Sequence, residues 1–381
     1  MNQNQFSFLT RKDPKKFPTY NQYKGILENG INNRFPTEVE DLISASPNAS
    51  QCSGIYANFL SGRGFQTQKI NLAEFYWNYY DQNDLLRDIV ESLSIHQGAF
   101  IHVRYNANFE KAGFNCLPYE NCRISKIDSQ GYYGFVYHNS TAYQTRLFRD
   151  EEFTTKYHSY NPNSEIIVKQ VEAAGSIERY NGQVYYLKLS NKYAYTDPLI
   201  ARGAWDCAEI DDHLNKYYLG VVKNGFHDTV IVRHRPFKSQ EVLDQFEKVL
   251  ENAIGTKNAS SILRIEDDFG GEDIQGSYKI EQLKNETKAD KFQHLEQVVA
   301  NKIRKAYKNI PPQLTDFVQG KLGNTSGEDL IKATAVYNQY TSDDRTKIER
   351  VFSELFTNFH QDLGNDWTIQ PYEILDTGTI N

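Results

Sequence analysis

The stretch that decides the fold is ADKFQHLEQVVANKIRKAYKNIPP, which covers residues 289–312. Its apolar and small residues recur at intervals of three and four, which places them on one face of an α-helix. They are Phe292, Leu295, Val299, Ile303, Ala306 and Ile310. The pattern therefore predicts a helix from Ala289 to Ile310, about 33 Å long at 1.5 Å per residue. Pro311 and Pro312 are expected to end it, because proline lacks a backbone donor and clashes with the preceding turn.

A polar loop and a second long helix are predicted to follow the two prolines. The loop reads QGKLGNTSGE from Gln319, and Ser326 offers a helix N-cap with two acids in the turn after it. Both halves of the next helix have an apolar face. Between them, Tyr340–Asp344 brings together residues that weaken a helix, so we expect a kink or a fresh helix start there.

A rod-like helix, a double-proline stop, a polar loop and an interrupted long helix, in this order, resemble the portal proteins of tailed double-stranded-DNA phages. Three upstream stretches extend the resemblance in the same order. Cys52–Phe65 ends in SGRGF, like the family's early helix. Tyr195–Pro198 opens a candidate first stem helix that ends at Asn224–Phe226, and Gly255 to Ala259 falls where the family has its clip.

The resemblance implies an α+β portal fold with an α/β wing, a two-helix stem, an α/β clip, a tunnel loop and a kinked long helix, with the crown minimal or absent. The implied boundaries are an N-terminal arm at 1–36, the wing at 37–196, the first stem helix at 197–226, the clip at 227–286, the second stem helix at 287–310, the tunnel loop at 311–327, and the kinked wing helix with a C-terminal strand at 328–381.

The function implied by the resemblance is that of a ring, typically of twelve copies, at one capsid vertex. DNA would be packaged and ejected through its channel without sequence recognition. The implied partners are further copies of the chain, double-stranded DNA, the large terminase, the major capsid protein and the head-tail adaptor, with assembly in the host cytoplasm and a final place in the virion. No cofactor and no enzymatic activity are expected. Gly320-Lys321 is followed by Leu322 rather than Ser or Thr, so the chain lacks a Walker A loop.

The resemblance also assigns candidate site residues. In the tunnel loop they are Gln319, Lys321, Asn324 and Thr325, and for docking of terminase and adaptor on the clip they are Arg233, Arg235 and Lys238. The basic residues of the stem are Lys302, Lys305 and Lys308. The negative end of a helix dipole favours cations there in any case, so a purely structural role for these lysines stays open.

Composition restricts the class of protein. The 381 residues carry a net charge of −7, which argues against a protein that coats DNA, since such proteins are basic. The four cysteines show neither CxxC pairs nor zinc-type spacing and are expected to be reduced. No apolar stretch is long enough for a secretion signal or a membrane span, so no membrane contact is expected.

The wing region is predicted to begin with helices and continue as a mixed β region. Helical patterns cover 37–60, with a break at Pro47, and 71–97, and residues 1–36 are expected to be an extended arm. Strands are predicted where the pattern alternates, at 99–105, 132–137, 164–171, 183–189 and 367–374, with Asn181-Gly182 as a hairpin turn.

Two alternatives to a portal remain. Asp206, Glu209 and His213 share one face of the predicted helix after Pro198 and, with carboxylates such as Asp211, would be the ligands of a metal-dependent hydrolase or nuclease. One helix supplies no closed coordination shell, so a solvated helix face is the favoured interpretation and no metal is expected. The other alternative is a different ring-forming connector of the virion. Gly62 and Gly64, which flank Arg63, also allow a phosphate-binding nest, although the full GxGxxG motif is missing.

Overall fold

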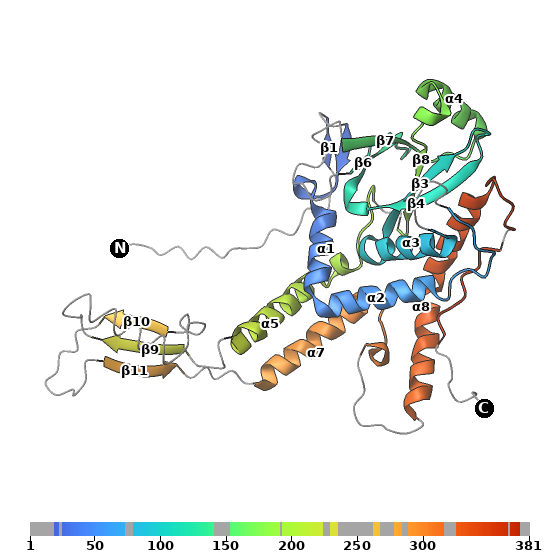
Figure 1. Ribbon diagram of the computed structural model, residues 1–381. Helices are drawn as coiled ribbons and strands as arrows, with labels where there is room; N and C mark the ends of the chain where they lie inside the picture. The colour runs from blue at the N-terminus through green and yellow to red at the C-terminus, as the bar shows by residue number, and fades with distance from the viewer. Residues whose placement is uncertain are drawn as a thin grey trace. The chain divides into compact units, whose positions relative to one another are not determined.

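The computed structural model describes residues 19–22, 25–72, 79–140, 153–190, 193–223, 229–234, 262–266, 278–283, 289–315, 325–364 and 366–373 (Figure 1). The chain divides into two compact units. The first unit is discontinuous in sequence and consists of residues 1–208 and 301–381, and the second consists of residues 209–300. The content is mixed helix and sheet, so the predicted α+β class is confirmed. No described helix is long and apolar enough to cross a membrane.

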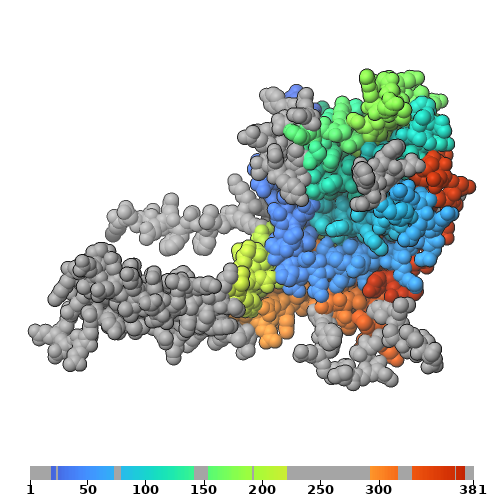
Figure 2. Space-filling model, viewed as in Figure 1, coloured from blue at the N-terminus to red at the C-terminus, as the bar shows by residue number. Residues whose placement is uncertain are grey.

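Three helices follow the N-terminal strands of the first unit, and blue atoms of this part of the chain lie at the surface in Figure 2. The break at Pro47 is confirmed: Ser46 caps the second helix by accepting the N–H of Ala49 (3.2 Å), and Pro47 occupies its first turn. The third helix starts later than the predicted Asn71, because Asp81 and Asp84 form a capping box there. These helices are α1 (Phe35–Ala45), α2 (Pro47–Ser61) and α3 (Gln82–His96).

A six-stranded sheet packs beside these helices (Figure 1). Its order is β4 (Lys111–Leu117), β3 (Gly98–Tyr105), β8 (Gln183–Lys188), β7 (Thr154–Ser159), β6 (Phe135–Asn139) and β5 (Cys122–Ile124). All neighbours are antiparallel except β7 and β8, which are parallel. The core on one face contains stacked Phe100 and Tyr186, with ring centroids 4.1 Å apart.

Several expectations for this region were wrong. The predicted strand at 164–171 is helix α4 (Ser164–Ala174), which Asn163 caps by accepting the N–H of Glu165 (2.9 Å). Asn181-Gly182 forms no hairpin, because β8 pairs antiparallel with β3 and follows the short 3₁₀ turn η4 (Ile177–Arg179). Gly182 is instead needed for close packing, since a Cβ there would lie 2.3 Å from the carbonyl oxygen of Val103.

The two ends of the first unit also differ from prediction. Within the predicted arm, β1 (Thr19–Asn21) and β2 (Ile26–Glu28) form an antiparallel hairpin, followed by the 3₁₀ turn η1 (Ile31–Asn33). The described part of the predicted C-terminal strand, Trp367–Glu373, is not a strand. Gln370 instead exchanges two main-chain hydrogen bonds with Arg63 and Gly64 (2.9 and 3.2 Å).

The long helices keep their order but change their bounds. Helix α5 (Trp205–Lys223) begins after the 3₁₀ turn η5 (Ile200–Arg202), because Gly203 has φ +154° and interrupts the run from Pro198. Helix α7 (Ala289–Ala306) ends before the prolines, since Lys308 and Asn309 adopt left-handed backbone with φ +56° and +57°. The 3₁₀ turn η7 (Pro312–Leu314) follows.

Helix α8 (Thr325–Phe356) is continuous, so the expected fresh helix start near Tyr340 is wrong, and Ser326 lies inside the helix rather than capping it. The residues at 340–344 that were expected to weaken the helix have a different effect. Thr341 and Ser342 donate their hydroxyls back to main-chain carbonyls one turn earlier (3.0 and 2.7 Å), a contact that often bends helices. The ribbon of α8 changes direction along its length in Figure 1.

The second unit contains a three-stranded sheet. Strand β9 (Thr229–His234) lies between parallel β10 (Ile262–Glu266) and antiparallel β11 (Tyr278–Leu283). The rest of the predicted clip, including Gly255 to Ala259, lies outside the described residues. Tyr217 of α5 stacks on Phe292 of α7 within this unit, with centroids 5.3 Å apart and planes 6° from parallel.

Lys111, at the start of β4, provides a pH-dependent contribution to stability. The residue is 4% exposed, and its ammonium donates to the hydroxyl of Tyr160 and the carbonyl oxygen of Glu354, both at 2.8 Å. Burial lowers the pKa of Lys111 to about 8. The folded protein then holds fewer protons than the unfolded chain between pH 8 and the usual lysine pKa of about 10.4.

We therefore expect the stability of the wild type, relative to a Lys111→Met variant, to increase as pH rises from about 8 to about 10.4. Urea unfolding at several pH values would measure the difference. Exposed Lys169 on α4 offers the control substitution Lys169→Met, which should show no such trend. Parallel pH profiles for the wild type and Lys111→Met would contradict the expectation.

Candidate functional site

The last turns of α7 separate buried apolar residues from exposed cations. Val299, Ile303 and Tyr307 are between 0% and 2% exposed, whereas Lys302 and Lys305, one turn apart, are exposed. Among the described residues, no acid forms a salt bridge with either lysine. Both lysines therefore remain available for an anionic partner.

Lys308, the third predicted stem lysine, has a different role. Its ammonium pairs with the carboxylate of Asp344 on α8 and donates to the carbonyl oxygen of Tyr340 (3.4 Å). Asp344 is 5% exposed and also accepts the hydroxyl of Tyr56 from α2 (2.6 Å). Lys308 thus joins the end of α7 to α2 and α8, and the sequence prediction that grouped it with Lys302 and Lys305 did not reveal this contact.

Both described ends of the loop between α7 and α8 are anchored to the first unit. On the α7 side, the Thr315 carbonyl accepts Gln51 of α2 and the Thr315 hydroxyl accepts Arg304, both at 3.0 Å. On the α8 side, the hydroxyl of Tyr337 donates to the Tyr307 carbonyl (2.9 Å). The guanidinium of Arg345 donates to the Phe59 carbonyl of α2 (3.0 Å).

The predicted loop residues themselves fall mostly outside the described residues. Gln319, Lys321 and Asn324 are not described, and Thr325 is the first residue of α8. Of the predicted docking residues, Arg235 and Lys238 are also outside the described part. Arg233 lies on the central strand β9, level with Ile265 of β10 and Lys279 of β11.

The metal hypothesis for α5 finds no support in the geometry. Asp206 and His213 are exposed, Glu209 is half-buried, and among the described residues these three do not come together as potential ligands. The one group within the described ranges that could hold a metal ion is Glu40, His96 and Glu120. Sequence reasoning missed it, because the three residues belong to separate elements without a recognisable spacing.

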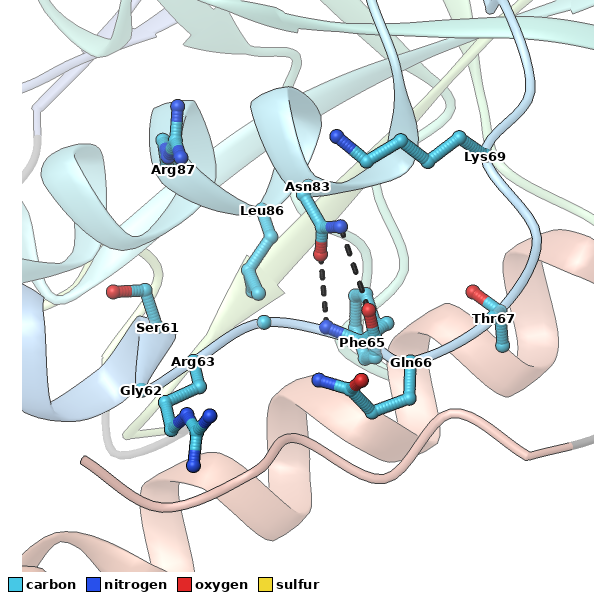
Figure 3. A pocket seen from close by; sticks show the side chains of 11 residues that line it. Ser61, Gly62, Arg63, Phe65, Gln66, Thr67, Lys69, Asn83, Leu86 and Arg87 are labelled. Atoms are coloured by element: carbon cyan, nitrogen blue, oxygen red, sulfur yellow. Dashed lines mark hydrogen bonds between the residues drawn. The ribbon is translucent and has the colours of Figure 1, made fainter. Parts of the chain in front are cut away.

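A surface cleft of about 470 Å³ lies beside the glycines that end α2 (Figure 3). The phosphate-nest hypothesis placed an anion at Gly62 and Gly64, but their N–H groups already donate to Asn58 and Ser61 (both 2.9 Å). The N–H of Arg63 donates to Gln370 (2.9 Å), and Asn83 binds both main-chain groups of Phe65 (2.8 and 3.5 Å).

The charges around this cleft are likewise occupied. Arg63 pairs with Glu373 (3.2 Å) and Lys69 with Asp81 (3.2 Å). The main-chain donors of the 62–65 turn and its one cation, Arg63, already have partners, and two of these partners, Gln370 and Glu373, belong to the C-terminal segment. The geometry therefore gives no support to a phosphate nest.

Comparisons with known proteins show similarity at the level of fold. No protein-family model and no curated protein sequence matches the chain. A chain in the structure of the virion of a native gene transfer agent particle superposes with TM-score 0.50 and 9% identity, covering 90% of this chain and 85% of that one. A chain in the neck of the empty particle, computed with C6 symmetry, gives TM-score 0.50 and 10% identity over the same shares.

A portal protein of the HK97 phage family from Corynebacterium diphtheriae is similar only at TM-score 0.39, with 9% identity over 77% of this chain and 84% of that one. That value is too low to support an argument about fold. The two higher-scoring matches cover nearly the whole chain, so the similarity includes both compact units. This protein therefore has the fold of a protein found in the virion and neck of gene transfer agent particles.

Proposed function

We propose that the chain is a portal protein, which forms a ring-shaped channel at one vertex of a phage-like capsid for DNA packaging and ejection. The observation that carries the proposal is the fold shared with a neck protein of gene transfer agent particles over 90% of the chain. The order of elements supports it, since helix α7, a loop with anchored ends and the long helix α8 follow one another.

The mechanism we propose is geometric. A head-to-tail contact between copies produces a closed ring when the rotation from one copy to the next is a whole fraction of a full turn. We propose a ring of twelve copies. The unit at 209–300 would supply the clip and most of the two stem helices, and the unit with the six-stranded sheet would supply the wing and the end of the second stem helix that carries Lys302 and Lys305. The loop residues Gln319, Lys321, Asn324 and Thr325 would contact the duplex backbone without reading its sequence.

Few phosphate contacts suit a channel through which DNA slides, because each additional contact strengthens binding. Lys302 and Lys305 would supply such contacts, whereas Lys308 is committed to Asp344. Arg233, Arg235 and Lys238 would take part in docking the large terminase and the head-tail adaptor, with the major capsid protein around the ring. ATP hydrolysis would come from the terminase. The ring would assemble in the host cytoplasm and end in the virion.

The test is deletion of Gly320–Thr325 together with a measurement of assembly. Since the anchors of the loop lie outside the deleted residues, the variant should still form rings with the wild-type number of subunits, visible as annular particles by negative-stain microscopy. DNA packaging or retention should be strongly impaired. A wild-type chain that stays monomeric during capsid assembly would overturn the portal proposal, and normal packaging by the deletion variant would overturn the role of the loop.

A charge test addresses Lys302 and Lys305. We expect the double change Lys302→Gln and Lys305→Gln to weaken the binding of rings to blunt-ended duplex DNA. The slope of log affinity against log salt should fall in magnitude by up to about 2 for each subunit in contact. The matched control is Lys169→Gln with Arg179→Gln, which removes two exposed charges from α4 and η4. An equal loss of slope in both variants would show a non-specific charge effect.

A further inference from the structure

Glu40, His96 and Glu120 lie together in the first unit, where α1, the end of α3 and the turn before β5 meet. Each offers one ligand atom, and these atoms all lie within 4.8 Å of one another. The Nε2 atom of His96 is 2.8 Å from Oε1 of Glu40. The His96 side chain is 2% exposed, whereas that of Glu40 is 31% exposed, so the cluster has a buried base and an opening to solvent.

The surroundings hold two of the three groups in place. The His96 ring stacks on Tyr119, with centroids 4.3 Å apart and planes 14° from parallel. The hydroxyl of Tyr119 is fixed by Tyr186 and Thr196, both at 2.9 Å. Tyr119 is also the neighbour of Glu120 in the 3₁₀ turn η2 (Tyr119–Asn121), so the turn that orients the imidazole also carries the second carboxyl group. Such pre-positioned side chains lower the cost of binding an ion.

The protein alone leaves this cluster poorly satisfied. Among the described residues, Nδ1 of the buried His96 has no hydrogen-bond partner, and Nε2, which faces Glu40, is the ring nitrogen placed to bind an ion. The carboxyl oxygens of Glu40 and Glu120 lie within 4.8 Å of each other, and two adjacent carboxylates repel each other unless a proton or a cation lies between them.

We propose that Glu40, His96 and Glu120 bind a divalent transition-metal ion of the Zn²⁺ type, which holds α1, α3 and η2 together. One imidazole nitrogen and two carboxylate oxygens are typical ligands of Zn²⁺, with water in the remaining position. Mg²⁺ is disfavoured, because it prefers an all-oxygen octahedral shell. The partly exposed Glu40 provides the entry path. This site is independent of the proposed channel, since no residue of the α7–α8 loop takes part.

The test is thermal unfolding and calorimetric titration of the full chain, first stripped with EDTA and then given Zn²⁺ or Mg²⁺ alone. For the wild type we expect saturable binding of one Zn²⁺ per chain with a rise in Tm, and no comparable rise with Mg²⁺. Glu40→Gln and Glu120→Gln keep the side-chain shape and should each weaken Zn²⁺ binding about 100-fold or more, beyond the roughly 10- to 100-fold typical of outer-shell changes.

The matched control is Asp206→Asn with Glu209→Gln, which removes charge from the α5 cluster that does not converge. It should bind Zn²⁺ like the wild type. The Tm of each metal-free variant shows whether it is folded before titration. The proposal is overturned if the wild type shows no saturable Zn²⁺ binding, if Glu40→Gln and Glu120→Gln retain it, or if Mg²⁺ stabilises the wild type equally.

Discussion

Replacing Arg123 with methionine should lower the free energy of unfolding by about 3–5 kcal/mol. The Arg123 side chain is 0% exposed. Its guanidinium donates to the carbonyl oxygens of Glu120 (2.8 Å), Cys122 (2.6 Å) and Asn33 (2.8 Å), and also to the side-chain oxygen of Asn33. Methionine fills similar space but leaves these oxygen acceptors without donors. Each buried acceptor without a hydrogen bond lowers the free energy of unfolding by about 1–3 kcal/mol.

Chemical unfolding at fixed protein concentration would measure the loss, and two variants test its cause. Arg123→Lys keeps the charge but replaces the planar guanidinium with a single ammonium group, which cannot reach all of these acceptors. Its free energy of unfolding should therefore lie between those of Arg123→Met and the wild type. Arg87→Met removes an exposed arginine from α3, whose side chain is 76% exposed, and should change stability by less than about 0.5 kcal/mol. Wild-type stability in Arg123→Met would show that the guanidinium contacts have no net value.

The second large effect is expected at Asp344, where Asp344→Ala should cost about 3–4 kcal/mol. The change leaves the hydroxyl of buried Tyr56 without its acceptor and separates Lys308 from its counterion. Tyr56→Phe removes the hydroxyl alone and should cost about 1–2 kcal/mol. The adjacent exposed residue offers the control Asp343→Ala on the same helix, with a change within about 0.5 kcal/mol.

A double-mutant cycle between Asp344→Ala and Lys308→Met isolates the ion pair, because the cycle removes effects that each change has alone. A coupling energy above about 1 kcal/mol is expected for this largely buried pair. A coupling energy near zero would show that Asp344 stabilises the protein through Tyr56 and that its ion pair with Lys308 contributes little.

Elements with explicit local signals could be predicted from the sequence. Pro47 predicted the break between α1 and α2, and the apolar spacing predicted the course of α7. Helix α4 was missed because its β-branched residues favour a strand, although Asn163 and Gly175 cap it at both ends. These caps stabilise the helix, because they provide hydrogen-bond partners for main-chain groups at its two ends that have none within the helix.

The features that depend on distant residues could not be predicted. The role of Lys308 depends on Asp344 and Tyr56, which reach it from other helices, so its spacing to Lys305 gave the wrong grouping. Glu40 and His96 are 56 residues apart and meet only through packing. The left-handed backbone at Lys308 and Asn309 that ends α7 likewise has no propensity signal comparable to that of the following prolines.

The discontinuity of the first unit determines when it can be completed on the ribosome. Phe65 packs against Phe352 and Trp367, with ring centroids 4.6 and 5.3 Å apart, and these partners are translated long after it. At about 5–20 residues per second, residues 209–367 take roughly 8–32 s to synthesise. During that interval Phe65 lacks these aromatic partners, so the first unit cannot complete its core before the C-terminal segment emerges.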